Sequence, residues 1–141
     1  MNHNLYKILY ENFKLDLDKI CIEIPDYKKL SFKDLDILSA HFASFLYDLG
    51  LKKGDRMICQ IDKSLSAIGL YLACLRMGVI YTPLNTSYTN DEVKYFIKNI
   101  EPKLFFSKPK LDDDFENMCS KLGVPFFKTI GIRDNDPVLK E

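Results

Sequence analysis

The chain has 141 residues and a mass of 16.4 kDa, which fits one domain with a true hydrophobic core. Apolar residues make up 47% and charged residues 28%, the usage of ordinary globular proteins, which argues against disorder, collagen and coiled coil. Twenty basic and twenty acidic residues cancel to a net charge of zero, which argues against a nucleic-acid binder that relies on a basic surface.

The first predicted elements are a short helix and a hairpin. Asn4 can cap a helix whose apolar face consists of Leu5, Ile8, Leu9 and Phe13. Residues 20–24 alternate between isoleucine and other residues, which predicts a half-buried strand. After a turn at Pro25-Asp26, residues 30–32 are predicted to return as its partner strand.

A long amphipathic helix is predicted next. Ser31 and Asp34 have the spacing of a capping box, and Gly50 is well placed to end the helix. The apolar residues recur along one stripe, at Leu35, Leu38, Phe42, Phe45, Leu46 and Leu49. Residues 56–61 then predict a strand.

A second helix is predicted from the cap at Ser64 to about Met77, with Gly78 at its end. Apolar residues cover nearly every side of it, so we expect it to be buried on more than one face. Gly69 costs about 1 kcal/mol relative to alanine in a helix interior. We expect this glycine to let another backbone come close.

The rest of the chain alternates strands and helices. It predicts a strand at 79–81, a polar loop at 82–89, a helix from the capping box of Thr89 and Glu92 to Pro102, a strand at 103–107, a helix at 111–122 and a strand at 124–127. This order predicts an α/β fold with a mostly parallel sheet flanked by helices, after a small hairpin near the start. Residues 128–141 show no periodicity and are predicted to be an irregular end, with a turn at 134–137.

Cysteine usage indicates a reducing compartment. The four cysteines, at positions 21, 59, 74 and 119, sit among apolar neighbours and form no Cys-x-x-Cys pair. We expect reduced, buried thiols and a cytoplasmic location. No apolar run reaches the ~18 residues of a membrane span, and the first residues lack the features of a signal peptide. Neither a membrane nor a nucleic acid is therefore expected as a partner.

Several residues could carry chemistry, and each also has a simpler interpretation. His41 could be a general base with Asp34 or Asp48, or a boundary histidine that packs its ring, which we favour. The acidic run 112–114 could bind a cation, or could complement the dipole at the start of a helix, which we favour. Arg76 could bind an anion, but its place near a helix C-terminus has the matching dipole explanation.

The hydroxyl and aromatic residues also have simpler structural explanations. Ser31 and Thr89 are better explained as caps than as nucleophiles, and Tyr81, Tyr88 and Tyr95 as half-buried packing rather than a stacking surface. The loop 82–89 follows a strand, so it should emerge at the carboxyl end, where ligands bind in open α/β sheets. It could equally be a solvated connection.

The phosphate-binding motifs are missing. The six glycines build neither G-x-G-x-x-G nor G-x-x-x-x-G-K-[ST]. We assign no catalytic, cofactor-binding or metal-binding residue from the sequence.

Three stretches nevertheless resemble the amino-terminal part of the AMP-forming acyl-CoA synthetases, the acyl-adenylate-forming ligases. They read Leu-Ser-Phe-Lys-Asp-Leu at 30–35, Leu-Gly-Leu-Lys-Lys-Gly-Asp-Arg at 49–56, and Ala-Cys-Leu-Arg-Met-Gly-Val-Ile-Tyr-Thr-Pro-Leu-Asn at 73–85. The continuation Thr-Ser-Tyr-Thr at 86–89, with Glu92 and Glu101-Pro102, is similar to the malonyl-CoA synthetase branch. The resemblance covers roughly residues 4–107.

The resemblance implies the large domain of the adenylate-forming ligase fold and a function in fatty acid metabolism. Such enzymes convert a carboxylic acid and ATP to an acyl-adenylate and pyrophosphate, and coenzyme A then displaces AMP. The family uses ATP, Mg and CoA. This sequence has no Thr/Ser/Gly-rich phosphate loop, no aromatic-Thr-Glu segment and no carboxyl-terminal domain with its lysine.

We therefore expect residues 1–141 to be a partial AMP-dependent synthetase/ligase domain: a truncated product, a gene fragment or an incomplete reading frame. It is expected to be inactive alone, to bind none of these cofactors by itself, and to have the remainder of the ligase as its partner. The alternatives are a non-catalytic interaction module or split-ligase partner, and an autonomous flavodoxin-like binding domain.

Overall fold

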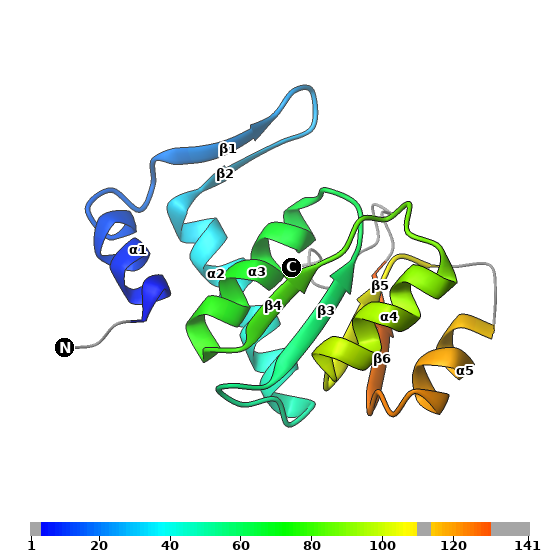
Figure 1. The fold of residues 1–141 in the computed structure, drawn as a ribbon. Coiled ribbons are helices and arrows are strands. Elements are labelled where there is room, and N and C mark those ends of the chain that lie inside the picture. The colour runs from blue at the N-terminus through cyan, green and yellow to red at the C-terminus, as the bar shows by residue number, and fades with distance from the viewer. Residues whose placement is uncertain (1–3, 110–113, 131–141) are drawn as a thin grey trace.

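The computed structural model describes residues 4–109 and 114–130 (Figure 1). The elements, in chain order, are α1 (Leu5–Phe13), β1 (Ile20–Ile24), β2 (Lys28–Ser31), α2 (Phe32–Asp48), β3 (Arg56–Gln60), α3 (Leu65–Met77), β4 (Ile80–Pro83), α4 (Asn90–Ile100), β5 (Leu104–Ser107), α5 (Asp114–Lys121) and β6 (Phe126–Thr129). The predicted α/β class is confirmed. The predicted turn at 134–137 lies outside the described residues.

The strands form two sheets. β1 and β2 pair as an antiparallel hairpin, and the other four strands form a parallel sheet in the order β4-β3-β5-β6. In Figure 1 the hairpin stands to one side of this sheet. Because β4 and β5 lie on opposite sides of β3, the strand order reverses between β3 and β5.

Helices cover both faces of the parallel sheet. Met57 and Cys59 of β3 and Phe106 of β5 pack in the core formed with α2 and α3. Ile58 and Phe105, which alternate with them, pack in the core formed with α4 and α5, the two helices at the right of Figure 1. Burial on both faces explains why these strands are continuous apolar runs.

The predicted helix ends are confirmed. Ser31 Oγ accepts a hydrogen bond from Asp34 N at 3.2 Å, and Asp34 Oδ2 accepts one from Ser31 N at 2.8 Å, which makes a reciprocal capping box. Thr89 and Glu92 repeat this arrangement at the start of α4. Gly78 ends α3 in the left-handed conformation, with φ at 72°.

The prediction for Gly69 was wrong about what packs against it. We expected another backbone to come close, but the neighbours are the side chains of Leu38 and Phe42 on α2. A Cβ atom on residue 69 would lie 2.7 Å from Leu38 Cγ and 3.0 Å from Phe42 Cδ2. The glycine therefore lets two buried side chains of α2 pack directly against α3.

Several boundary predictions and part of one face prediction were wrong. The partner strand predicted at 30–32 is β2 at 28–31, and Phe32 begins α2. Thr82 and Pro83 belong to β4, and Lys128 and Thr129 to β6, because parallel pairing with β3 and with β5 extends these strands. Of the predicted face of α1, Leu9 and Phe13 do pack beside the buried Tyr6, whereas Leu5 and Ile8 are 47% and 54% exposed. The cause is that α1 packs on α2 and α3 through Tyr6.

The cysteine prediction is confirmed for three of the four residues. None of the four is in a disulfide, and Cys59, Cys74 and Cys119 are buried, whereas Cys21 is only half-buried. Burial raises the pKa of Cys59 to about 11 and that of Cys74 to about 12, so both thiols stay protonated at neutral pH. Within the described ranges, no helix has both the length and the apolar character required to cross a membrane.

Candidate functional site

The candidate site is the carboxyl edge of the parallel sheet between β3 and β5. Gln60 and Ser107 end these two strands, are aligned partners in the sheet, and are both fully buried. The strand order reverses between them, and open α/β sheets bind ligands beside the carboxyl ends of strands at such a reversal. Neither residue was predicted from the sequence as a site residue.

Gln60 connects this edge to the loop after β4. Its Nε2 donates a hydrogen bond to the carbonyl oxygen of Asn85 at 2.9 Å. Its Oε1 is buried and has no hydrogen-bond partner among the described residues. A buried acceptor without a donor costs about 1–3 kcal/mol. The orphaned oxygen therefore makes this edge a place where a donor from a ligand, a water or another polypeptide segment would be stabilising.

The other polar groups at this edge are paired with each other. Ser107 Oγ donates to the carbonyl oxygen of Lys108 at 2.9 Å. Lys108 Nζ lies 3.8 Å from Asp62 Oδ1 in a half-exposed ion pair. One cation and one anion balance, so these two side chains give the edge no positive surplus.

The predicted ligand loop does leave the carboxyl end of β4. However, much of it is used for structure, since Leu84 is buried in the α4–α5 core and Tyr88 stacks on Phe96 with 5.4 Å between ring centroids. Thr89 caps α4. The contribution of the loop to the candidate site is thus the Asn85 carbonyl that holds Gln60.

Other sequence candidates lie away from this edge. His41 is exposed on α2, which corrects the expected packing of its ring, and Asp34 is engaged in the capping box. Tyr81 and Tyr88 are half-buried as predicted. Tyr95 is 64% exposed, because other residues supply the core side of α4.

The acidic run is only partly described. Asp112 and Asp113 lie outside the described residues, and Asp114 begins α5, where its charge complements the helix dipole as expected. Across residues 4–109 and 114–130, no three histidine, cysteine or acidic side chains are grouped so that they could hold a metal ion.

Arg76 has partners that the sequence did not reveal. It lies in the last turn of α3, as the dipole explanation requires. Its Nη1 lies 2.6 Å from Tyr6 Oη, 2.7 Å from Asp36 Oδ1 and 2.9 Å from Ser39 Oγ. Its guanidinium also stacks 4.4 Å from the centre of the Tyr6 ring. This cluster, hereafter the Arg76 cluster, joins α1, α2 and α3. The anion paired with Arg76 is the carboxylate of Asp36.

Tyr6 stays neutral within the Arg76 cluster. Burial, together with its 2.5 Å hydrogen bond to Asp36 Oδ1, raises the pKa of Tyr6 to about 12. Asn4 adds a further link between α1 and α3, since its Nδ2 donates to the carbonyl oxygens of Leu75 and Arg76. The cluster therefore fixes α1 to the rest of the fold.

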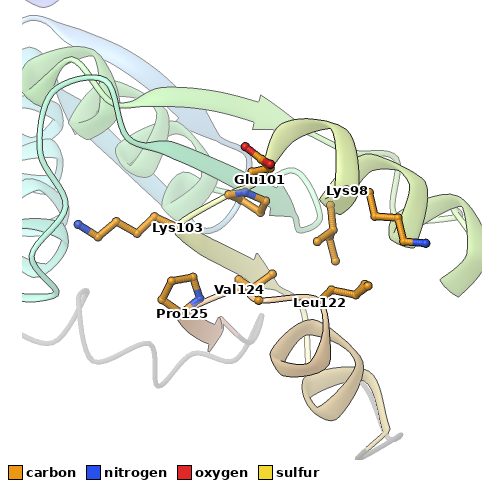
Figure 2. A pocket seen from close by; sticks show the side chains of 9 residues that line it. Lys98, Glu101, Lys103, Leu122, Val124 and Pro125 are labelled. Carbon is orange, nitrogen blue, oxygen red and sulfur yellow. The ribbon is translucent and has the colours of Figure 1, made fainter.

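A cavity of about 550 Å³ lies at the opposite, amino-terminal edge of the sheet (Figure 2). Its labelled lining comprises Lys98, Glu101, Lys103, Leu122, Val124 and Pro125. Lys103 Nζ is already bound to the Gly50 carbonyl oxygen at 2.6 Å and to Asp55 Oδ2 at 3.0 Å. Because ligands in open α/β sheets bind at carboxyl edges, we place the candidate site at Gln60 rather than here.

Two substitutions test whether the buried Oε1 of Gln60 lacks a hydrogen-bond partner. Gln60→Glu is expected to lower the free energy of unfolding by about 2 kcal/mol, because it removes the donor to Asn85 and buries a carboxylate. Gln60→Met should cost less than about 1 kcal/mol, because it removes the orphaned acceptor together with the donor. Urea unfolding at neutral pH measures both. Equal losses in the two variants would mean that Oε1 has a partner.

Comparison with known proteins places these features in a family. The family model described as AMP-binding enzyme matches residues 10–141. The chain is 36% identical to the apo MatB crystal structure from Rhodopseudomonas palustris, with a TM-score of 0.87, over 98% of this chain and 27% of that one. It is 27% identical to a medium-chain fatty-acid–CoA ligase of Escherichia coli, over 64% of this chain and 16% of the relative.

A third relative differs in size. The chain is 32% identical to the nonribosomal peptide synthetase GRA1 of Gibberella zeae, over 84% of this chain and 2% of that protein. The chain thus spans about a quarter or less of the length of each of these three relatives. The family model covers nearly the whole chain, and the hairpin and parallel sheet match the amino-terminal part of MatB. The chain therefore belongs to the AMP-binding enzyme family.

Proposed function

We propose that this chain forms the amino-terminal part of the catalytic domain of an AMP-forming acyl-CoA ligase of the malonyl-CoA synthetase type. The supporting observation is the similarity to MatB, at 36% identity along 98% of the chain. Such a ligase joins a carboxylic acid to ATP as an acyl-adenylate, with loss of pyrophosphate, and coenzyme A then displaces AMP. Malonate is the proposed acid, and fatty acid metabolism the proposed context.

The role proposed for this chain is framework. Its carboxyl edge offers Gln60, Ser107 and a balanced pair of Lys108 and Asp62. Its glycines are isolated and form no phosphate-binding loop. These residues do not fit a triphosphate with magnesium, so we derive no nucleotide step from them.

The nucleotide, magnesium and coenzyme A are instead proposed to be held by other polypeptide of the same domain. ATP-bound MatB is among the similar structures, and this chain matches 27% of it. Most of the residues of that protein therefore lie outside the match. A cytoplasmic location belongs to the same proposal and agrees with four cysteines that are not in disulfides.

The test is ATP–pyrophosphate exchange with malonate. The 141-residue chain alone is expected to give no exchange. A single polypeptide in which this chain replaces the matching part of MatB, hereafter the MatB graft, is expected to be active. The matched control is the same replacement in the benzoate CoA ligase of Burkholderia xenovorans, which is 16% identical and should tolerate it poorly. Exchange by the chain alone, or a folded but inactive MatB graft, would contradict the proposal.

A further inference from the structure

An apolar groove lies between β1, α3 and β4. It has a volume of about 510 Å³, and its apolar lining includes Ile22 and Ile24 of β1, Ile68 and Tyr71 of α3, and Tyr81 of β4. It is separate from the candidate site at the carboxyl edge. Its lining therefore comes from the hairpin, from α3 and from the edge strand β4.

The groove leaves large apolar side chains in water. The prediction that α3 is buried on more than one face is confirmed, since it packs on α2 and the sheet on one side and on α1 on another, yet Ile68 and Tyr71 are 40% and 41% exposed. Both side chains line the groove, whereas Gly69 of the same helix packs against α2. Neighbouring exposed apolar side chains of this size are typical of a surface that binds polypeptide.

β4 adds an exposed strand edge beside the groove. Among the described strands it pairs with β3 alone. The amides of Ile80 and Leu84 donate to the carbonyl oxygens of Asp55 and Cys59, toward β3. Because successive backbone amides of a strand point to opposite sides, the amide of Tyr81 points away from β3, to the outer edge of the sheet. A strand edge next to an apolar groove is the arrangement that binds extended segments.

We propose that this groove and the outer edge of β4 dock an extended apolar segment from the remaining part of an AMP-binding enzyme domain. The inference rests on the proposed function. Relatives supply the occupant, since this chain matches 27% of MatB and most of that protein lies outside the match. Ile68 and Tyr71 insert into the interface, and the Tyr81 amide donates to the docked segment.

The first experiment measures association without activity. The probe is MatB from which the part matching this chain has been removed, and the intact 141-residue chain is titrated against it. Ile68→Lys is expected to weaken binding at least tenfold, because it places a charge in the apolar interface. Ile37→Lys is the matched control, since Ile37 is 44% exposed on α2 and does not line the groove. It should change binding less than twofold.

The second experiment does not need the probe to fold separately. Amide hydrogen exchange at Tyr81 is expected to be at least tenfold slower in the MatB graft than in the isolated chain. Equal exchange, or equal weakening by Ile68→Lys and Ile37→Lys, overturns the docking site. Self-association of the isolated chain that Ile68→Lys abolishes would also overturn it, in favour of a second copy.

The two proposals fail in different ways. A MatB graft that is active, with no effect of Ile68→Lys and no protection at Tyr81, removes the docking site and leaves the proposed function. A graft that is protected at Tyr81 but inactive supports the docking site and contradicts the proposed function.

Discussion

Replacing Gly69 with valine is expected to lower the free energy of unfolding by about 3 kcal/mol, as measured by urea unfolding. The first added carbon would lie 2.7 Å from Leu38 Cγ and 3.0 Å from Phe42 Cδ2, and both of these side chains are buried. Leu38 Cγ is a branch point close to the backbone, so it cannot move aside as a flexible chain end could. Alanine at position 69 should cost about 1 kcal/mol, because its better helix propensity offsets part of the overlap.

A double-mutant cycle separates this overlap from other effects of valine. Leu38→Ala alone should cost about 2–5 kcal/mol through the cavity that it leaves. In the double variant the valine occupies part of that cavity. The combined loss should therefore be at least about 1 kcal/mol smaller than the sum of the single losses. If the two losses were strictly additive, Leu38 would not be the residue that limits the size of the side chain at position 69.

The parts of the fold that the sequence predicted are local. The capping boxes at Ser31 and Thr89 each link residues three positions apart, and the left-handed glycine at position 78 depends only on its own backbone. The strand order β4-β3-β5-β6 is set by packing between distant segments. Alternation of strands and helices predicted a parallel sheet, but it contains no information on which strands are neighbours.

The face of α1 shows why periodicity alone can fail. The predicted stripe through Leu5, Ile8, Leu9 and Phe13 and the observed stripe through Tyr6, Leu9, Tyr10 and Phe13 both fit a helical repeat. Which face of α1 is buried depends on the hydrogen bonds of Tyr6 with the Asp36 and Arg76 side chains, which lie 30 and 70 residues away in the sequence. No local pattern contains that contact.

The candidate site was predicted only in part. The position of loop 82–89 follows from the strand before it, so the carboxyl edge could be anticipated. Gln60 could have been found as well, since a polar residue ends the buried run Met57-Ile58-Cys59. Its orphaned Oε1 could not, because that depends on the loop carrying Asn85 and on the neighbouring strand β5.

Replacing Arg76 with methionine is expected to lower the free energy of unfolding by about 3 kcal/mol. Methionine retains much of the apolar stem but leaves the Asp36 carboxylate without its cation, in a site where the Arg76 and Asp36 side chains are only 29% and 26% exposed. It also removes the cation that stacks on the Tyr6 ring. Lysine at this position should recover part of the loss, since it restores the charge but not the planar guanidinium.

The matched control for Arg76 is Arg56→Met. Arg56 pairs with Glu101 at 3.5 Å, but these side chains are 45% and 79% exposed, so the loss should stay below about 1 kcal/mol. Hydrogen exchange should also differ, with faster exchange of the α1 amides in Arg76→Met alone, because the Arg76 cluster fixes α1. Equal losses in the two variants would contradict a stabilising role for the cluster.

The pH dependence tests the tyrosine in the same cluster. The pKa of Tyr6 is raised to about 12 in the folded chain, above its ordinary value of 10.0. A raised pKa gives a contribution to stability that is fully present below the unfolded value and is lost as the pH rises through the folded value. The difference between wild type and Tyr6→Phe should therefore stay constant from about pH 6 to 8 and shrink only above about pH 10. A change between pH 6 and 8 would mean that another group of the cluster titrates there.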